Sequence, residues 1–157
     1  MALPPLSFEA YESSSPDSYA GDPIWRTRMF RMASYLGGRC ADDVAQLGTR
    51  VSLSLASQFI RAVGSVTANI AEGYSRGPTG DRLRFYTCAL GSAREALAWI
   101  DALGNAPWAP RAEYRDLLVQ IRRQLLTAIK TRRPLTYQKQ AGPRKHGPTI
   151  ANRNPES

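Results

Sequence analysis

The chain has 157 residues, of which 43% are hydrophobic, and is therefore long enough to fold as one domain with a buried core. Its net charge is +8, and 18 of its 21 basic residues are arginine, whose planar guanidinium pairs well with phosphate, although a GC-rich genome would produce the same bias without any partner. Two cysteines without a Cys-x-x-Cys spacing and one histidine, His146, exclude most Cys/His metal sites, and no run approaches the roughly 20 apolar residues of a membrane span. Because no signal peptide is visible either, we expect a cytoplasmic protein.

The two ends of the chain carry opposite charge. Residues 1–23 hold four acidic and no basic residues and are rich in Pro and Ser, which predicts an acidic flexible leader. Three aromatic side chains could act as its short anchors: Phe8, Tyr11 and Tyr19. Residues 130–157 carry a charge of +6, and the Pro, Gly and basic residues of 134–157 predict a basic flexible tail. The folded domain is expected over 24–133.

The first helix is expected to begin near Pro23, because proline suits a first helical turn, and Gly37-Gly38 is expected to weaken or end it. Residues 39–48 could add a further short helix. The second helix is expected over about 49–75, and Gly77-Pro78 stops it. Its apolar stripe recurs at three- and four-residue spacing: Phe59, Val63, Val66 and Ile70.

The third helix is expected to start after Thr79, a residue type suited to an N-cap, and to close at Gly104-Asn105. Its stripe has the alternating spacing of a bundle seam: Leu83, Tyr86, Leu90, Ala93, Leu97 and Ile100. The fourth helix is expected from Pro110 to about Arg133. No stretch alternates in the manner of a β-strand, so we expect an all-α fold, an antiparallel up-down four-helix bundle over 24–133 with a flexible leader and tail.

One side of the second helix is polar. Its residues fall within an arc of roughly 80° at 100° per residue: Gln58, Arg61, Ser65, Asn69, Glu72 and Arg76. This face could simply be solvated, or it could form a subunit contact or line a channel, which would require its polar groups to be satisfied. The exposure of Asn69 separates these alternatives.

The third helix carries more apolar surface than one neighbour needs. A second apolar row accompanies its main stripe: Phe85, Ala89, Ala96, Trp99 and Leu103. Burial between subunits would use this surplus, so we predict an oligomer interface that includes Phe85 and Trp99. Alternatively, the first helix or the leader covers the row within one chain.

Residues 65–73 read S-V-T-A-N-I-A-E-G and resemble the S-I-x-A-N-I-A-E-G signature of the bacterial four helix bundle protein family, some members of which are encoded in intervening sequences of large-subunit ribosomal RNA genes. Upstream, Gln58 and Arg61-Ala62 are similar to the family's Q-x-x-R-A stretch, and Ile24-Trp25 to the start of its first helix. Downstream, 89–95 read A-L-G-S-A-R-E and are similar to its A-x-G-S-x-x-E stretch. The resemblance covers about 24–130 and assigns the following family-motif positions: Gln58, Arg61, Ser65, Asn69, Glu72, Gly73, Gly91, Ser92 and Glu95.

The resemblance implies an antiparallel four-helix bundle that commonly assembles as a homopentamer. It also implies similarity to the accessory variability protein of diversity-generating retroelements, a basic pentameric barrel that binds a reverse transcriptase and nucleic acid. The chain departs from the family between the first two helices, where a Phe-Pro turn is usual. Here 37–43 read G-G-R-C-A-D-D and are several residues longer, which leaves the helix packing open at this point.

No residue pattern predicts catalysis. Nucleophilic catalysis needs a base beside the nucleophile, and the one histidine lies in the predicted tail. Glu72 and Glu95 could face each other between the second and third helices, but a structural role is favoured for both. The chain contains no Glu-x-x-His pair, no Walker loop and no G-x-G-x-x-G motif. We therefore predict no enzyme activity, no catalytic or metal-binding residue and no cofactor.

The charge favours an oligomeric accessory protein that binds RNA or DNA and could partner a reverse transcriptase. The predicted contacts lie at the corner between the second and third helices and near the end of the fourth: Arg76, Arg82, Arg84, Arg122, Arg123, Lys130, Arg132 and Arg133. These charges could instead serve solubility. The alternative function is a scaffold that assembles as a pentameric ring and docks a protein partner without binding nucleic acid. The acidic leader could also fold onto a basic surface of its own assembly and compete with nucleic acid.

Overall fold

The computed structural model describes residues 7–78 and 80–132, and every regular element within these ranges is helical. The four long helices are α2 (Arg28–Ala45), α3 (Leu53–Ser75), α4 (Gly80–Ala102) and α5 (Arg111–Arg132). The short helix α1 (Phe8–Ser13) precedes them, and 3-10 turns lie at Asp17–Tyr19, Pro23–Arg26 and Gly48–Arg50. The all-α prediction is confirmed for this part of the chain.

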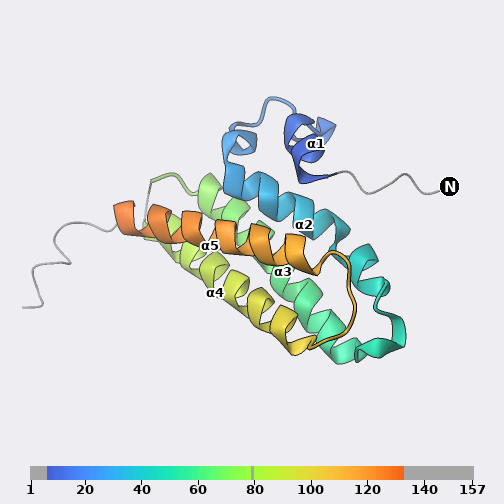
Figure 1. Ribbon diagram of the computed structural model, residues 1–157. Helices are drawn as coiled ribbons and strands as arrows, with labels where there is room; N and C mark the ends of the chain where they lie inside the picture. Colours follow the sequence, from blue (N-terminus) through green and yellow to red (C-terminus); the bar gives the residue numbers. More distant parts are fainter. Residues whose placement is uncertain (1–6, 79, 133–157) are drawn as a thin grey trace, which may run out of the picture.

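The four long helices lie side by side around one core (Figure 1). α3 packs against α2 and α4, and α5 packs against the same two helices, an arrangement compatible with a four-helix bundle. The predicted stripes supply the core, and each helix contributes fully buried side chains, among them Leu36, Ile70, Ile100 and Leu118.

α2 continues through Gly37-Gly38, so the predicted end of the first helix at this point is wrong, and 39–48 do not begin a separate helix. A Cβ atom at position 37 would lie 3.0 Å from Thr67 Oγ1 of α3. The same hydroxyl donates a hydrogen bond to Ala33 O over 2.8 Å. Gly37 therefore permits a close contact between α2 and α3, and α2 continues although each glycine lowers helix propensity by roughly 1 kcal/mol.

Residues 7–22 fold onto α2, where the sequence predicted a flexible leader (Figure 1). Phe8 is buried, and Tyr11 packs edge-on against Trp25 with 5.5 Å between ring centroids. Tyr19 stacks on the same indole at 5.2 Å. The Pro- and Ser-rich acidic composition predicts flexibility, but the buried Phe8 and the ring contacts with Trp25 hold the segment against α2. The part of the leader that the structure describes is therefore an ordered arm.

The ends of α3 follow local chemistry. Ser52 caps its start, since the hydroxyl accepts a hydrogen bond from Leu55 N at 3.2 Å, and the helix begins a few residues later than predicted. At its end Gly77 adopts a φ of +65°, a left-handed conformation that favours glycine, as the predicted stop requires. Thr79, the predicted cap of the next helix, lies outside the described residues, as does the predicted tail over 134–157. Among the described helices, none combines the length and apolarity that a membrane crossing needs.

Candidate nucleic-acid interface

The corner between α3 and α4 brings together the three arginines predicted there, but Arg82 has a structural role. Its Nε and Nη2 donate hydrogen bonds to Gly73 O (3.2 Å) and Tyr74 O (3.0 Å) at the end of α3. A cation at this position stabilises the negative end of the helix dipole and satisfies carbonyls that the helix leaves unpaired. The guanidinium is half-buried and already used, so Arg82 is a poor phosphate ligand.

The other two corner arginines are exposed and paired. Arg76 forms an ion pair with Glu72, and Arg84 lies 3.7 Å from Asp81. Both guanidinium groups lie over the ring of Phe85, at 5.5 Å and 4.5 Å from its centroid. With two carboxylates opposing three arginines, the corner carries a net charge of only +1.

The predicted contacts on α5 are different, because those that the structure describes form no ion pair. Arg123 and Lys130 are exposed and Arg122 is half-buried, and none of the three forms an ion pair with another described residue. From 117 to 131 the helix contains no acidic residue. We call these three residues the α5 cluster. Arg132 is the last residue of α5, and its side chain and the whole of Arg133 lie outside the described part.

The polar face of α3 lies at the seam with α4. Ser65 Oγ is hydrogen-bonded to Ser92 Oγ across the seam at 2.9 Å, and Asn69 Nδ2 donates to Ser65 O (2.8 Å) and Ser65 Oγ (3.1 Å). Asn69 is half-buried. The polar groups at the centre of this face are therefore hydrogen-bonded, and they join α3 to α4 within one chain.

Gly73 has a steric role at the same seam. A Cβ atom there would lie 2.7 Å from two carbon atoms of the Tyr86 ring and 3.1 Å from Phe85 Cβ. Such distances are shorter than a van der Waals contact, so only glycine permits α4 to approach α3 this closely.

The remaining family-motif residues that the structure describes do not form one site. Glu72 pairs with Arg76, whereas Glu95 accepts a hydrogen bond from Trp99 Nε1 at 3.2 Å, so each carboxylate has a partner on its own helix. Gln58 is half-buried, and Arg61 and Gly91 are exposed. In the described part of the chain, the side chains of Gln58 and Arg61 make no hydrogen bond or ion pair.

Most of the second apolar row of α4 is buried within the chain. Ala89, Ala96 and Leu103 are buried, whereas Phe85 and Trp99 are half-buried. The main packing partners of α4 are α3 and α5, rather than the first helix or the leader. The apolar surface left for a partner is therefore smaller than predicted and centres on two aromatic side chains.

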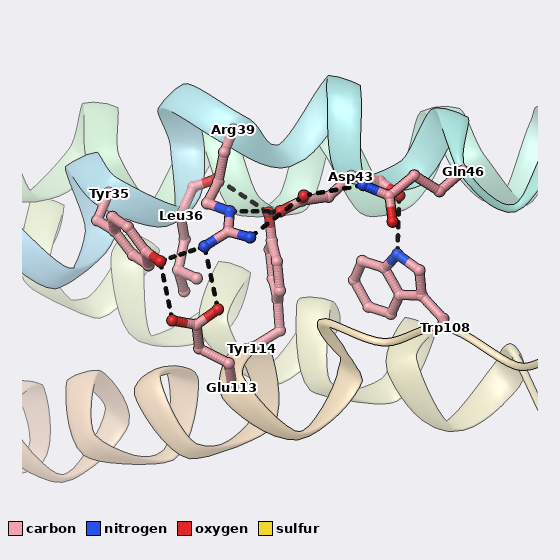
Figure 2. Close-up of polar contacts among 8 residues, drawn as sticks. All are labelled: Tyr35, Leu36, Arg39, Asp43, Gln46, Trp108, Glu113 and Tyr114. Atoms are coloured by element: carbon pink, nitrogen blue, oxygen red, sulfur yellow. Dashed lines mark hydrogen bonds and ion pairs between the residues drawn. The ribbon is translucent and has the colours of Figure 1, made fainter. Parts of the chain in front are cut away.

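Sequence reasoning missed a polar network between α2 and α5 (Figure 2). Asp43, only 4% exposed, accepts hydrogen bonds from Arg39 Nε (2.6 Å) and from Tyr114 OH (3.0 Å). Arg39 Nη1 also donates to Glu113 Oε2 at 3.0 Å, and Tyr35 OH donates to Glu113 Oε1 at 2.8 Å. The spacing of Arg39 and Asp43, four residues apart on one helix, was the only available sequence indication.

The two tyrosines of the network have raised pKa values. Burial and the hydrogen bond to Glu113 raise the pKa of Tyr35 to about 12, and burial raises the pKa of Tyr114 above its usual range. Burial also raises the pKa of the neighbouring Cys40 thiol to about 12. Every carboxylate in the network has a donor, so the arrangement fixes α5 on α2. In the described part of the chain, no three His, Cys, Asp or Glu side chains are grouped closely enough to hold a metal ion.

A family model described as 23S rRNA-intervening sequence protein matches residues 36–127, which include the α3–α4 seam and most of the α5 cluster. No curated protein and no solved structure shows a significant match.

Proposed function

The chain belongs to the 23S rRNA-intervening sequence protein family, and we propose that it is a non-enzymatic protein that binds the phosphodiester backbone of RNA or DNA through α5. The observation that carries the proposal is the α5 cluster, in which Arg122, Arg123 and Lys130 have no acidic partner. Cations of this kind bind phosphate without reading sequence, because they contact a part of the nucleic acid that every sequence shares.

Oligomerisation belongs to the same proposal. We expect an up-down antiparallel bundle that assembles as a cytoplasmic homopentamer, supported by the family resemblance and by the half-buried Phe85 and Trp99 on α4. A ring would place five α5 clusters on one particle and raise the local positive charge. Light scattering should give a mass of about five times 17.3 kDa, and a monomer would contradict this part of the proposal.

A comparison of two sets of charge-neutralising variants tests the binding surface. Arg122→Gln with Arg123→Gln removes unpaired charge, whereas Arg76→Gln with Arg84→Gln removes the same charge from residues that face carboxylates. At about 50 mM salt, the α5 double variant should weaken binding to a labelled RNA by roughly tenfold or more, and the corner variant by much less. Equal losses would assign binding to net charge rather than to α5.

The second candidate function is a scaffold that docks a protein such as a reverse transcriptase. It is supported by an open apolar groove of about 640 Å³ between the end of α2 and the start of α3. The groove is lined by Val44, Leu47, Val51, Leu53, Ala56 and Ile60. Leu53 is 89% exposed, which is unusual for so large an apolar side chain. If the wild-type chain fails to bind nucleic acid at low salt, and Leu53→Asp abolishes co-purification with a reverse transcriptase, the scaffold function replaces the first.

A further inference from the structure

The carboxylate of Glu12, on α1, lies between two arginines at the start of α2. Its Oε1 accepts hydrogen bonds from Arg28 Nε (3.0 Å), Arg31 Nε (3.2 Å) and Arg31 Nη2 (2.9 Å). One anionic oxygen therefore occupies the point where two guanidinium groups converge. Arginine binds a phosphate oxygen through the same charge-assisted hydrogen bonds, so the carboxylate stands where a phosphate oxygen could bind.

The two arginines are also held by groups other than Glu12. Arg31 Nη1 donates a hydrogen bond to Trp25 O, and Arg28 Nη1 donates to Gln120 Oε1 of α5 at 3.1 Å. These contacts come from neighbouring elements of the bundle and would persist if the carboxylate moved away. The guanidinium groups are thus positioned in advance for an anion, which lowers the entropic cost of binding one.

The surroundings of this pair are electropositive. α2 begins at Arg28, its first turn contains no acidic residue, and Thr27 makes no side-chain capping bond, so the positive end of the helix dipole is not compensated within the helix. Gln120, which touches Arg28, is followed three residues later by Arg123, one turn further along the same side of α5. The pair therefore lies on the side of α5 that carries Arg123, one residue of the α5 cluster.

We propose that Arg28 and Arg31 form a second phosphate-binding patch that extends the α5 cluster, and that Glu12 occupies this patch as an internal competitor of the nucleic-acid backbone. The inference rests on the proposed function. Side-chain exposure of 47% for Arg28 and 26% for Glu12 leaves their contact open to water and salt, and ion pairs of this kind exchange readily. Hydrogen bonding from Arg31 and Arg28 lowers the pKa of Glu12 despite its desolvation, so the competitor is charged at neutral pH.

A matched pair of substitutions on α1 tests the competition. Glu12→Gln removes the charge that faces the patch, while Glu9→Gln removes the same charge from an exposed residue whose carboxylate forms no ion pair with another described residue. Both variants keep the buried Phe8 and the Tyr11–Ser34 hydrogen bond (2.9 Å) that hold α1 in place. Dissociation constants are measured at about 50 mM salt with a single-stranded RNA and a DNA duplex of equal length.

Glu12→Gln should tighten binding by about three- to tenfold, Glu9→Gln by less than about twofold, and the gain should vanish when Arg28→Gln and Arg31→Gln are added. A gain with RNA, with DNA or with both supports the patch and identifies the source of the phosphate. Equal effects of the two glutamate variants, or a gain that survives the arginine substitutions, would overturn the patch; the proposed function would still stand if the α5 variants weaken binding. Absence of binding by both wild type and Glu12→Gln would overturn both proposals.

Discussion

Replacing Gly73 by alanine tests the close contact between α3 and α4. The added methyl group would lie 2.7 Å from two atoms of the Tyr86 ring, and Tyr86 is only 4% exposed, so the ring has little room to move. Overpacking of this kind costs about 1–3 kcal/mol, against a gain of about 1 kcal/mol in helix propensity. Gly64 is the matched control, because it lies on the same helix and nothing stands within 4 Å of its Cβ position.

The free energy of unfolding should be measured by urea titration at fixed protein concentration, since an oligomer's stability depends on concentration. Gly64→Ala should gain up to about 1 kcal/mol, and Gly73→Ala should fall below it by about 1–3 kcal/mol. If Gly73→Ala is as stable as Gly64→Ala, the steric role of Gly73 is refuted.

Three further predictions concern buried and paired groups. Asp43→Asn should lower the free energy of unfolding by about 2–3 kcal/mol, because it removes the buried one of the two carboxylates that pair with Arg39, and a loss under about 1 kcal/mol would contradict the buried pair. In the native protein at pH 8 one thiol per chain should react quickly with Ellman's reagent, because Cys88 is exposed whereas Cys40 is buried with its pKa raised to about 12; two fast thiols would contradict this burial. The pKa of Glu12 is lowered from 4.5 in the folded chain, so its contribution to stability is present above that pH and lost as pH falls through the lower folded value. The difference in Tm between wild type and Glu12→Gln should therefore disappear in acid, and a pH-independent difference would count against the ion pair.

Apolar periodicity predicted the four long helices well, because the buried stripes of a bundle follow directly from the helical repeat. The periodicity of one helix cannot show how packing against another helix affects a predicted helix end. The propensity of Gly37-Gly38 argues for a helix end, and only the position of Thr67 on α3 shows why the helix continues. Likewise the composition of the leader argues for flexibility, and only Trp25 and its neighbours show where its aromatic side chains pack.

The sequence could identify which basic residues are candidates for the interface, but not which of them are free to bind phosphate on one surface of the fold. The sequence already separates Arg84 from Arg123, because Asp81 lies three residues before the first, whereas 117–131 contain no acidic residue around the second. Arg28 and Arg31 could not be singled out, because the significance of Glu12 depends on how α1 folds back onto α2. Spacing along one helix identifies the partners of Arg76 and Arg84, whereas the partners of Arg82, Arg28 and Arg31 come from other elements and appear only in the fold.

The central claim, that α5 binds the phosphate backbone, is tested most directly by a salt titration. Affinity for a DNA duplex is measured between about 50 and 200 mM salt for the wild type and for a variant with Arg122, Arg123 and Lys130 changed to Gln. Each phosphate contact contributes about 0.9 to the slope of log K against log salt concentration, so the variant's slope should be shallower by up to about 2.7. Binding by the wild type with a slope that the variant leaves unchanged, or no binding at 50 mM, would contradict the account.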